Sequence, residues 1–157
     1  MVHLVYCDNT GRAGSRTLDR IMSGEKTMVV RGAAGRKIPH SRVFEGEMIY
    51  FMEKGTKEIS ASARVKAVYN YTGLSDEAIE EILDKFSAEL SLTDKQRERW
   101  HKKCLCLTAF ENVQRIDPPL LFDKQSNMDD WLILEKIEDA LVGTSIPYNY
   151  EKSKLKG

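Results

Sequence analysis

Two cations lie five positions apart in the segment Gly24-Glu25-Lys26-Thr27-Met28-Val29-Val30-Arg31. The glycine is expected to end a short helix, and Lys26 then lies on the turn. The β-branched residues that follow favour a strand, and this strand carries Arg31. A turn that leads directly into a strand can direct both side chains towards one anion. The segment therefore predicts a binding site for a negatively charged ligand.

Lys26 has three possible roles. A lysine that is partly desolvated at such a turn has a lowered pKa and acts as a base or a nucleophile. A lysine that stays charged binds a phosphate or a base carbonyl. A solvated lysine only favours the C-terminus of the preceding helix. The residues alone leave these alternatives open.

The loop 32–41, which follows Arg31, contains two glycines and a proline, so we expect it to be exposed and to approach a ligand closely. Arg31 offers a planar fork for a phosphate or a base edge, and cations of the loop can close over the ligand. His40 is the nearby group that titrates close to neutrality, although a single loop histidine is more often a bystander. The predicted ligand-binding residues are Lys26, Arg31, Arg36, Lys37, Arg12, Arg16 and His40.

The charges are distributed unevenly although the net charge is zero. Residues 1–72 hold 12 Lys and Arg against 7 Asp and Glu, whereas residues 73–157 hold 12 against 17. A basic patch on a neutral protein favours a local anionic ligand, such as a nucleotide or a short strand, over coating of duplex DNA. The alternative is that these cations are solvated, or pair with carboxylates such as Asp19, Glu45 and Glu47.

The hydrophobic pattern predicts an α+β fold, with one domain over 1–142 and a polar tail over 143–157. A continuous helix is expected over 75–90, and a capping box formed by Thr93 and Gln96 predicts another. Pro118 and Pro119 are expected to end the strand before them. The expected strands are 2–6, 27–31, 48–52, 59–67, 105–113 and the apolar run 131–134; short helices are expected around 18–22 and over 135–141.

Composition narrows the functional class further. An odd number of cysteines, Cys7, Cys104 and Cys106, indicates buried reduced thiols and a cytoplasmic location. The histidines and cysteines lack the spacing of zinc ligands, so no metal and no cofactor is expected. No signal peptide and no membrane span is expected either. The oligomeric state is left open.

The segment from Gly24 to Arg31, followed by Gly46-Glu47 and an apolar strand, resembles the signature of the ASCH domain in the PUA-like superfamily, Gly-x-Lys-x-x-Glu-x-Arg. The acidic position of that signature is Val29 here. The resemblance implies a small mixed β-barrel with a helix after the first strand and a helical insertion before the closing strand. It also implies a cleft in which Lys26 and Arg31 meet a ligand.

The function expected from this resemblance is binding of RNA or a nucleotide-like ligand around Lys26 and Arg31. The first alternative is a small hydrolase, either a ribonuclease or an enzyme similar to the acetylcytidine amidohydrolases. In the acetylcytidine amidohydrolases a catalytic hydroxyl occupies the position of Val29. Thr27 is a doubtful substitute for it, because successive strand residues face opposite ways. The second alternative is a protein-interaction module that uses the acidic second half.

Aromatic residues can add stacking surfaces for an unpaired base. Tyr50, Tyr69, Tyr71 and Trp100 are the candidates, although core packing explains some of them equally well. Trp131 is expected to anchor the closing segment to the core. Asp129 and Asp130 are expected either to cap the last helix or to face the basic cleft.

Overall fold

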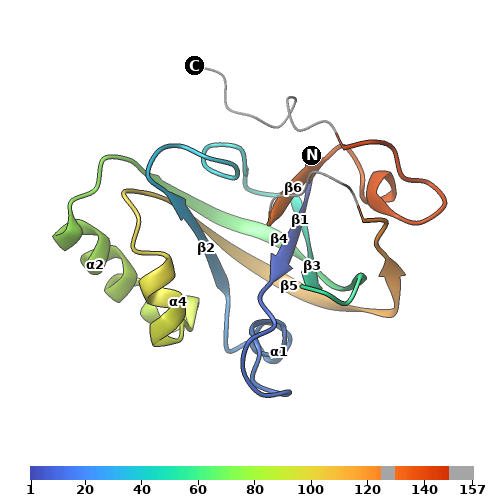
Figure 1. Cartoon of the computed structure of the whole chain (residues 1–157), viewed down its shortest axis with the longest axis horizontal. Helices are drawn as coiled ribbons and strands as arrows, with labels where there is room; N and C mark the ends of the chain where they lie inside the picture. Colours follow the sequence, from blue (N-terminus) through green and yellow to red (C-terminus); the bar gives the residue numbers. More distant parts are fainter. Residues whose placement is uncertain (125–129, 149–157) are drawn as a thin grey trace.

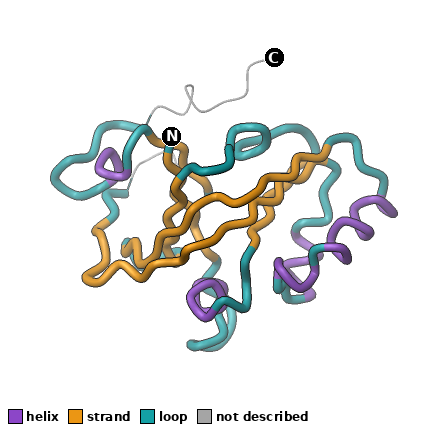
Figure 2. Tube along the Cα trace, turned by 180° about the vertical axis from the view of Figure 1, so that it is seen from behind, coloured by secondary structure: helices purple, strands orange, loops and turns teal. Residues whose placement is uncertain are grey.

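The computed structural model describes residues 1–124 and 130–148. Six strands form one sheet in the order β2-β5-β4-β3-β1-β6, which curls into a half-barrel (Figures 1 and 2). Strands β1 and β3 pair in parallel, and the other pairs are antiparallel. The strands are β1 (Val2–Cys7), β2 (Met28–Ala33), β3 (Met48–Glu53), β4 (Glu58–Tyr71), β5 (Cys104–Leu121) and β6 (Trp131–Leu134).

The helices lie where the resemblance places them. Helix α1 (Thr17–Ser23) follows the first strand, and α2 (Asp76–Lys85), α3 (Ser87–Leu90) and α4 (Asp94–Arg99) are inserted between β4 and β5. A short 3₁₀ helix, η1 (Ile137–Ala140), follows β6. Figure 1 shows α2 and α4 at one end of the sheet and α1 beneath it. The expected α+β architecture, with a helix after the first strand and a helical insertion later in the chain, is confirmed.

Successive side chains of β2 point to opposite faces of the strand, and the two faces pack into different clusters. Met28 and Val30 face one way and pack with Leu83 and Leu90 of the helical insertion. Val29 faces the opposite way, into the concave side of the half-barrel, where it joins the main core cluster. Because side chains alternate along a strand, Arg31 lies on the same face as Val29. The strand therefore directs one cation into the half-barrel.

Two sequence predictions about individual elements are wrong. The helix expected over 75–90 is interrupted at Phe86, whose φ of −105° and ψ of 18° leave the helical region. This break lets the Phe86 ring pack against Tyr69, with 5.0 Å between ring centroids, while Leu90 stays in the same core cluster.

Strand β5 also continues through Pro118 and Pro119 instead of ending before them. The register with β4 shifts at this point, because Ile59 pairs with Leu120 and Ala61 with Arg115. The prolines lie in the resulting bulge, and the other partner of β5, strand β2, pairs only as far as Ala109. A residue without an N–H is tolerated there because no ladder bond is required of it.

The remaining general expectations concern cysteines, metals and membranes. All three cysteines are free and buried. Within 1–124 and 130–148, no group of three His, Cys, Asp or Glu could hold a metal ion. No helix in the same part of the chain has the length and hydropathy needed to span a membrane. Residue Asp129 and the segment 149–157 of the expected tail lie outside the described residues.

Candidate functional site

Lys26 and Arg31 line one cavity of about 200 Å³, which we call the inner chamber. It lies where the end of β1, the start of α1, strand β2 and helix α4 meet. Besides Lys26 and Arg31, its polar and aromatic walls include Asp8, Gln96, Trp100 and Asp130. The two cations predicted from the sequence therefore converge on one hollow.

Lys26 forms part of the chamber wall and is only 4% exposed. Its backbone N–H donates to the Arg20 carbonyl, and its ammonium group Nζ donates to the carbonyl of Leu90 at the end of α3. Burial, together with the positive charges of Arg31 and Arg20, lowers the pKa of Lys26 to about 7. The alternative of a solvated lysine is wrong, whereas the other two roles remain possible for a buried amine of this pKa.

The Arg31 guanidinium is held in a fixed orientation. Its Nη2 donates to the Tyr6 carbonyl at 2.8 Å and its Nη1 to the Val30 carbonyl at 2.9 Å. Its Cζ lies 5.3 Å from the ring centroid of Trp100 and 5.8 Å from that of Trp131, which is favourable for a cation near an aromatic face. The buried Nε has no hydrogen-bond partner among the described residues. Neither Arg31 nor Lys26 forms an ion pair with a carboxylate in this part of the chain.

A buried chain of hydrogen bonds positions the Trp131 ring that lies beside the Arg31 guanidinium. The Trp131 indole N–H donates to His3 Nδ1 at 3.0 Å, so Nε2 carries the histidine proton and donates to Glu47 at 2.9 Å. Burial lowers the pKa of His3 despite the neighbouring carboxylate, and this favours the neutral ring. Glu47 of the Gly46-Glu47 motif is thereby linked to the Trp131 ring beside Arg31.

Asp8 adds a hydrogen-bond acceptor to the chamber. Its carboxylate accepts from the Thr10 N–H at 2.9 Å, from the Thr10 hydroxyl at 2.7 Å and from Gln96 Nε2 at 2.8 Å. Burial raises the pKa of Asp8, but these hydrogen bonds outweigh that effect, so the net pKa is lowered. Asp8 therefore stays ionised close to the two cations.

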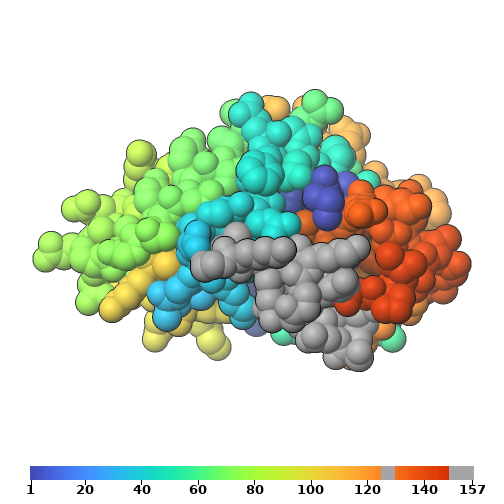
Figure 3. All heavy atoms as spheres, turned by 90° about the horizontal axis from the view of Figure 1, so that it is seen from above, coloured from blue at the N-terminus to red at the C-terminus, as the bar shows by residue number. Residues whose placement is uncertain are grey.

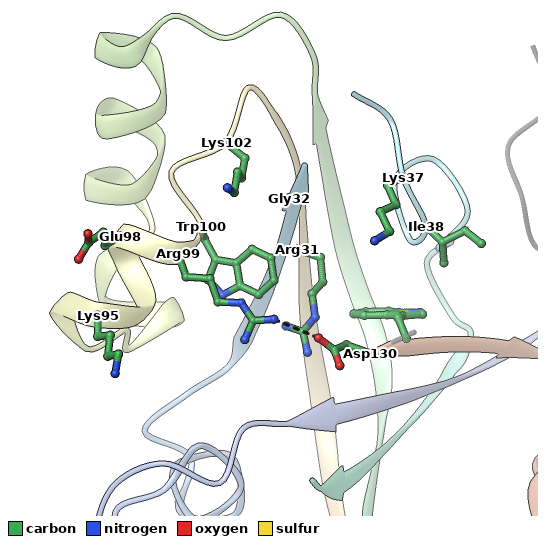
Figure 4. A pocket seen from close by; sticks show the side chains of 11 residues that line it. Arg31, Gly32, Lys37, Ile38, Lys95, Glu98, Arg99, Trp100, Lys102 and Asp130 are labelled. Carbon is green, nitrogen blue, oxygen red and sulfur yellow. Dashed lines mark hydrogen bonds and ion pairs between the residues drawn. The ribbon is translucent and has the colours of Figure 1, made fainter. Parts of the chain in front are cut away.

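The inner chamber adjoins a larger cavity of about 730 Å³, which we call the outer groove. Arg31, Arg99, Trp100 and Asp130 line both hollows. Figure 4 shows the guanidinium groups of Arg31 and Arg99 close together, with Asp130 beside them. Asp130 accepts from Arg99 at 3.0 Å. The groove also has lysines on its walls, which are Lys37, Lys95 and Lys102.

The expected role of the loop 32–41 requires a correction. Residues 34–37 are exposed, but Ile38, Pro39 and His40 are buried. Figure 3 shows this blue-to-cyan part of the chain crossing the upper face, between the green segment and the orange-red C-terminal segment. His40 Nε2 lies 3.2 Å from the Tyr71 carbonyl, and its Nδ1 lies 2.8 Å from the Ser41 hydroxyl. The segment 38–40 of the loop is therefore packed against the protein, whereas 34–37 is exposed.

The other predicted binding residues divide into two groups. Lys37 lines the outer groove. Arg12, Arg16, Arg36 and His40 line neither the inner chamber nor the outer groove. Arg16 instead lies 3.6 Å from Glu53 and donates to the Gly11 carbonyl. Among the aromatic candidates, Trp100 lines the site, whereas Tyr50, Tyr69 and Tyr71 do not.

Comparison with known proteins depends on the structure alone, since no family model and no curated protein matches the sequence. The fold is similar to the crystal structure of an ASCH protein from Zymomonas mobilis, with a TM-score of 0.55 at 15% identity over 73% of this chain and 70% of that one. A Tyr-to-Phe mutant and a Ser-to-Ala mutant of that protein each align with a TM-score of 0.62 at 16% identity. They cover 86% of this chain and 91% and 89% of theirs. The chain has the ASCH fold.

Within this ASCH fold, the position of Val29 carries no hydroxyl. Val29 is 2% exposed and lines the inner chamber together with Lys26. Thr27 is exposed and does not line it, as the strand alternation predicts. The hydroxyl of Thr17, at the start of α1, does line the chamber and accepts from Gln96 at 3.2 Å. Helix α1, and not strand β2, therefore supplies a hydroxyl group to the chamber.

Sequence reasoning missed Asp8, Gln96 and Arg99 as residues of the site. Gln96 was visible only as a capping-box residue of α4, and the structure confirms that role. Its side chain also reaches Asp8 in the segment after β1, 88 residues earlier in the chain. A local motif contains no signal for such a contact. Asp130 does face the basic cleft, which is one of the two roles expected for it.

Gly32 provides a stability test next to Arg31. A Cβ at Gly32 would lie 2.7 Å from Leu105 Cδ2, 3.0 Å from the Cys104 carbonyl and 3.0 Å from Lys102 Cβ. We expect Gly32→Ala to lower the free energy of unfolding by about 1–3 kcal/mol, because the crowded strand pair must shift. Urea denaturation measures this effect. The control is Gly35→Ala, where nothing lies within 4 Å of the new Cβ; equal stability of the two variants would contradict the prediction.

Proposed function

We propose that the chain binds RNA or a nucleotide-like ligand, with one nucleobase in the inner chamber and phosphate groups in the outer groove. The observation that carries the proposal is that Lys26 and Arg31 open onto one chamber without a carboxylate partner among the described residues. A ligand that accepts hydrogen bonds would satisfy donors that the protein leaves available.

The carboxylates favour a base over a phosphate inside the chamber. Asp8 and Asp130 both line it, and the hydrogen bonds to Asp8 keep its carboxylate ionised. A phosphate there would be repelled, whereas a base presents donors and acceptors on the same edge. Arg31 and Arg99 are held against Trp100, at 5.3 and 4.6 Å from its ring centroid. Their planar guanidinium groups can stack on a base or bind a phosphate through two N–H groups.

The outer groove is more suitable for phosphate. Among the described residues, five cations line it, namely Arg31, Lys37, Lys95, Arg99 and Lys102, against two carboxylates, Glu98 and Asp130. Asp130 is already paired with Arg99. The groove is therefore predominantly positive, and it shares a wall with the chamber.

Binding can be measured by intrinsic fluorescence, because Trp100 and Trp131 lie at the site. We expect quenching by nucleoside monophosphates and by single-stranded RNA, with an affinity that falls as salt concentration rises. The slope of log affinity against log salt counts the phosphate contacts, at about 0.7 per contact for single strands. Undetectable binding across the panel, or binding that salt does not change, would refute the proposal.

Hydrolysis is the second candidate, and one observation favours it. Lys26 has a pKa of about 7, so at neutral pH much of it is a free amine beside the chamber. Such an amine can remove a proton from water as the water oxygen adds to an amide carbonyl. The C–N bond then breaks, the proton passes to the leaving amine, and the products are a carboxylic acid and an amine.

Incubation with acetylcytidine and with labelled RNA tests this candidate, with mass spectrometry and gel electrophoresis as readouts. If neither substrate is hydrolysed, the chain is not a hydrolase of acetylcytidine or of this RNA. Turnover that survives Lys26→Ala excludes Lys26 as its base.

A further inference from the structure

A third hollow adjoins the inner chamber, at the turn between β3 and β4. It has a volume of about 350 Å³, and we call it the lysine groove because Lys54, Lys57 and Lys124 line it. The inner chamber shares Tyr6, Lys54 and Asp130 with the lysine groove, and it shares Arg31, Arg99, Trp100 and Asp130 with the outer groove. Asp130 lines all three hollows, and because the inner chamber shares further walls with each of the other two, we place it between them.

The lysine groove has unbalanced positive charge. Lys54, Lys57 and Lys124 are exposed, and none of them has an ion-pair partner within 1–124 and 130–148. Asp130 is the carboxylate on its described walls, and it already accepts from Arg99. An anion in the groove would thus meet three ammonium groups that form no ion pair in this part of the chain.

The floor of the lysine groove is apolar. Met52, Tyr6 and Phe122 line it, and the two rings pack edge to face with 5.8 Å between centroids. All three residues are less than 8% exposed, so they form a fixed surface. A cationic rim over a rigid apolar floor suits the sugars and phosphates of a passing strand, whereas the buried rings leave no open face for a stacked base.

We propose that the ligand of this protein is a single-stranded RNA that extends on both sides of the nucleotide in the inner chamber. One flank lies over the outer groove and the other over the lysine groove. A free nucleotide would leave Lys54, Lys57 and Lys124 without a partner, whereas a continuing strand supplies phosphates to all three hollows. The inference rests on the proposed function and specifies its ligand as an internal segment of a strand.

The test uses the full chain with Lys54, Lys57 and Lys124 all changed to glutamine. The probes are a nucleoside monophosphate and a labelled nine-nucleotide single-stranded RNA, measured by fluorescence quenching and anisotropy. We expect the wild-type chain to bind the RNA at least about tenfold more tightly than the monophosphate. The triple variant should lose about tenfold in RNA affinity and reduce the salt slope by about two, at about 0.7 per contact. The double variant with only Lys57 and Lys124 changed to glutamine keeps the chamber residue Lys54, so it should lose RNA affinity but bind the monophosphate within twofold of wild type.

A matched control separates a local groove from general charge. Lys85, Lys103 and Lys136 are exposed lysines that line none of the three hollows, and changing them to glutamine alters the net charge equally. If the control loses as much RNA affinity as the triple variant, or if the triple variant binds RNA like wild type, the strand path is wrong. Monophosphate binding without tighter RNA binding overturns this inference alone. Absence of binding to both probes overturns the proposed function as well.

Discussion

Arg31→Ala is expected to weaken binding of single-stranded RNA by about 10- to 100-fold, since hydrogen bonds to charged groups contribute about 1.5–3 kcal/mol each. The reason is geometric. The guanidinium group lines both the inner chamber and the outer groove, is oriented by the Tyr6 carbonyl and has an Nε without a described partner. Fluorescence titration with the nine-nucleotide RNA measures the change.

Two further variants make this result interpretable. Arg31→Lys keeps the charge but loses the planar fork, so it should restore only part of the affinity. Arg36→Ala removes an exposed arginine that lines neither hollow, and its affinity should remain within twofold of wild type. Thermal unfolding of each variant shows whether the fold is intact. An Arg31→Ala protein that is folded and binds normally would exclude the inner chamber as the binding site.

Replacement of Lys26 is expected to have opposite effects on stability and on binding. In the folded protein, burial lowers its pKa to about 7 from the ordinary 10.5. Above pH 7 the unfolded chain therefore keeps a proton that the folded protein has lost. Stability should rise with pH from about 7 to 8.5, by up to about 1.4 kcal/mol per pH unit. Below pH 7 both states are protonated, and the full cost of burying the charge remains.

Lys26→Met removes this titration. The variant should be more stable than wild type at pH 6, and the difference should shrink as the pH rises to about 8.5. Cys7, whose pKa burial raises to about 12, affects the comparison only above its ordinary value of 9. Urea denaturation at four pH values gives the two curves. Parallel curves would mean that Lys26 does not titrate in this range.

Binding should respond to pH in the opposite direction. A base carbonyl in the chamber accepts a stronger hydrogen bond from the protonated amine, so affinity for RNA should fall as the pH rises through 7. Lys26→Met should lower the affinity at pH 6 and abolish this pH dependence. Affinity that is independent of pH in the wild-type chain would assign Lys26 a structural role only.

Local signals were sufficient for much of the fold. Gly24 ends α1 with a φ of 86°, as a glycine after a short amphipathic helix predicts. The capping box of Thr93 and Gln96 begins α4, and the alternation of small residues in β4 marks its buried face. These features depend on backbone conformation and on neighbours a few residues away. The convergence of Lys26 and Arg31 on one chamber also followed from a short motif.

Long-range packing accounts for the features that the sequence did not predict. The helix break at Phe86 and the path of β5 through Pro118 depend on what each segment packs against, and propensity does not record this. Lys26 is buried because α3, more than sixty residues later, places the Leu90 carbonyl above it. The contact of Gln96 with Asp8 also joins segments that meet only after the half-barrel has formed. Residue types and local spacing identify groups capable of chemistry, whereas their burial, pKa and partners arise from contacts between distant parts of the chain.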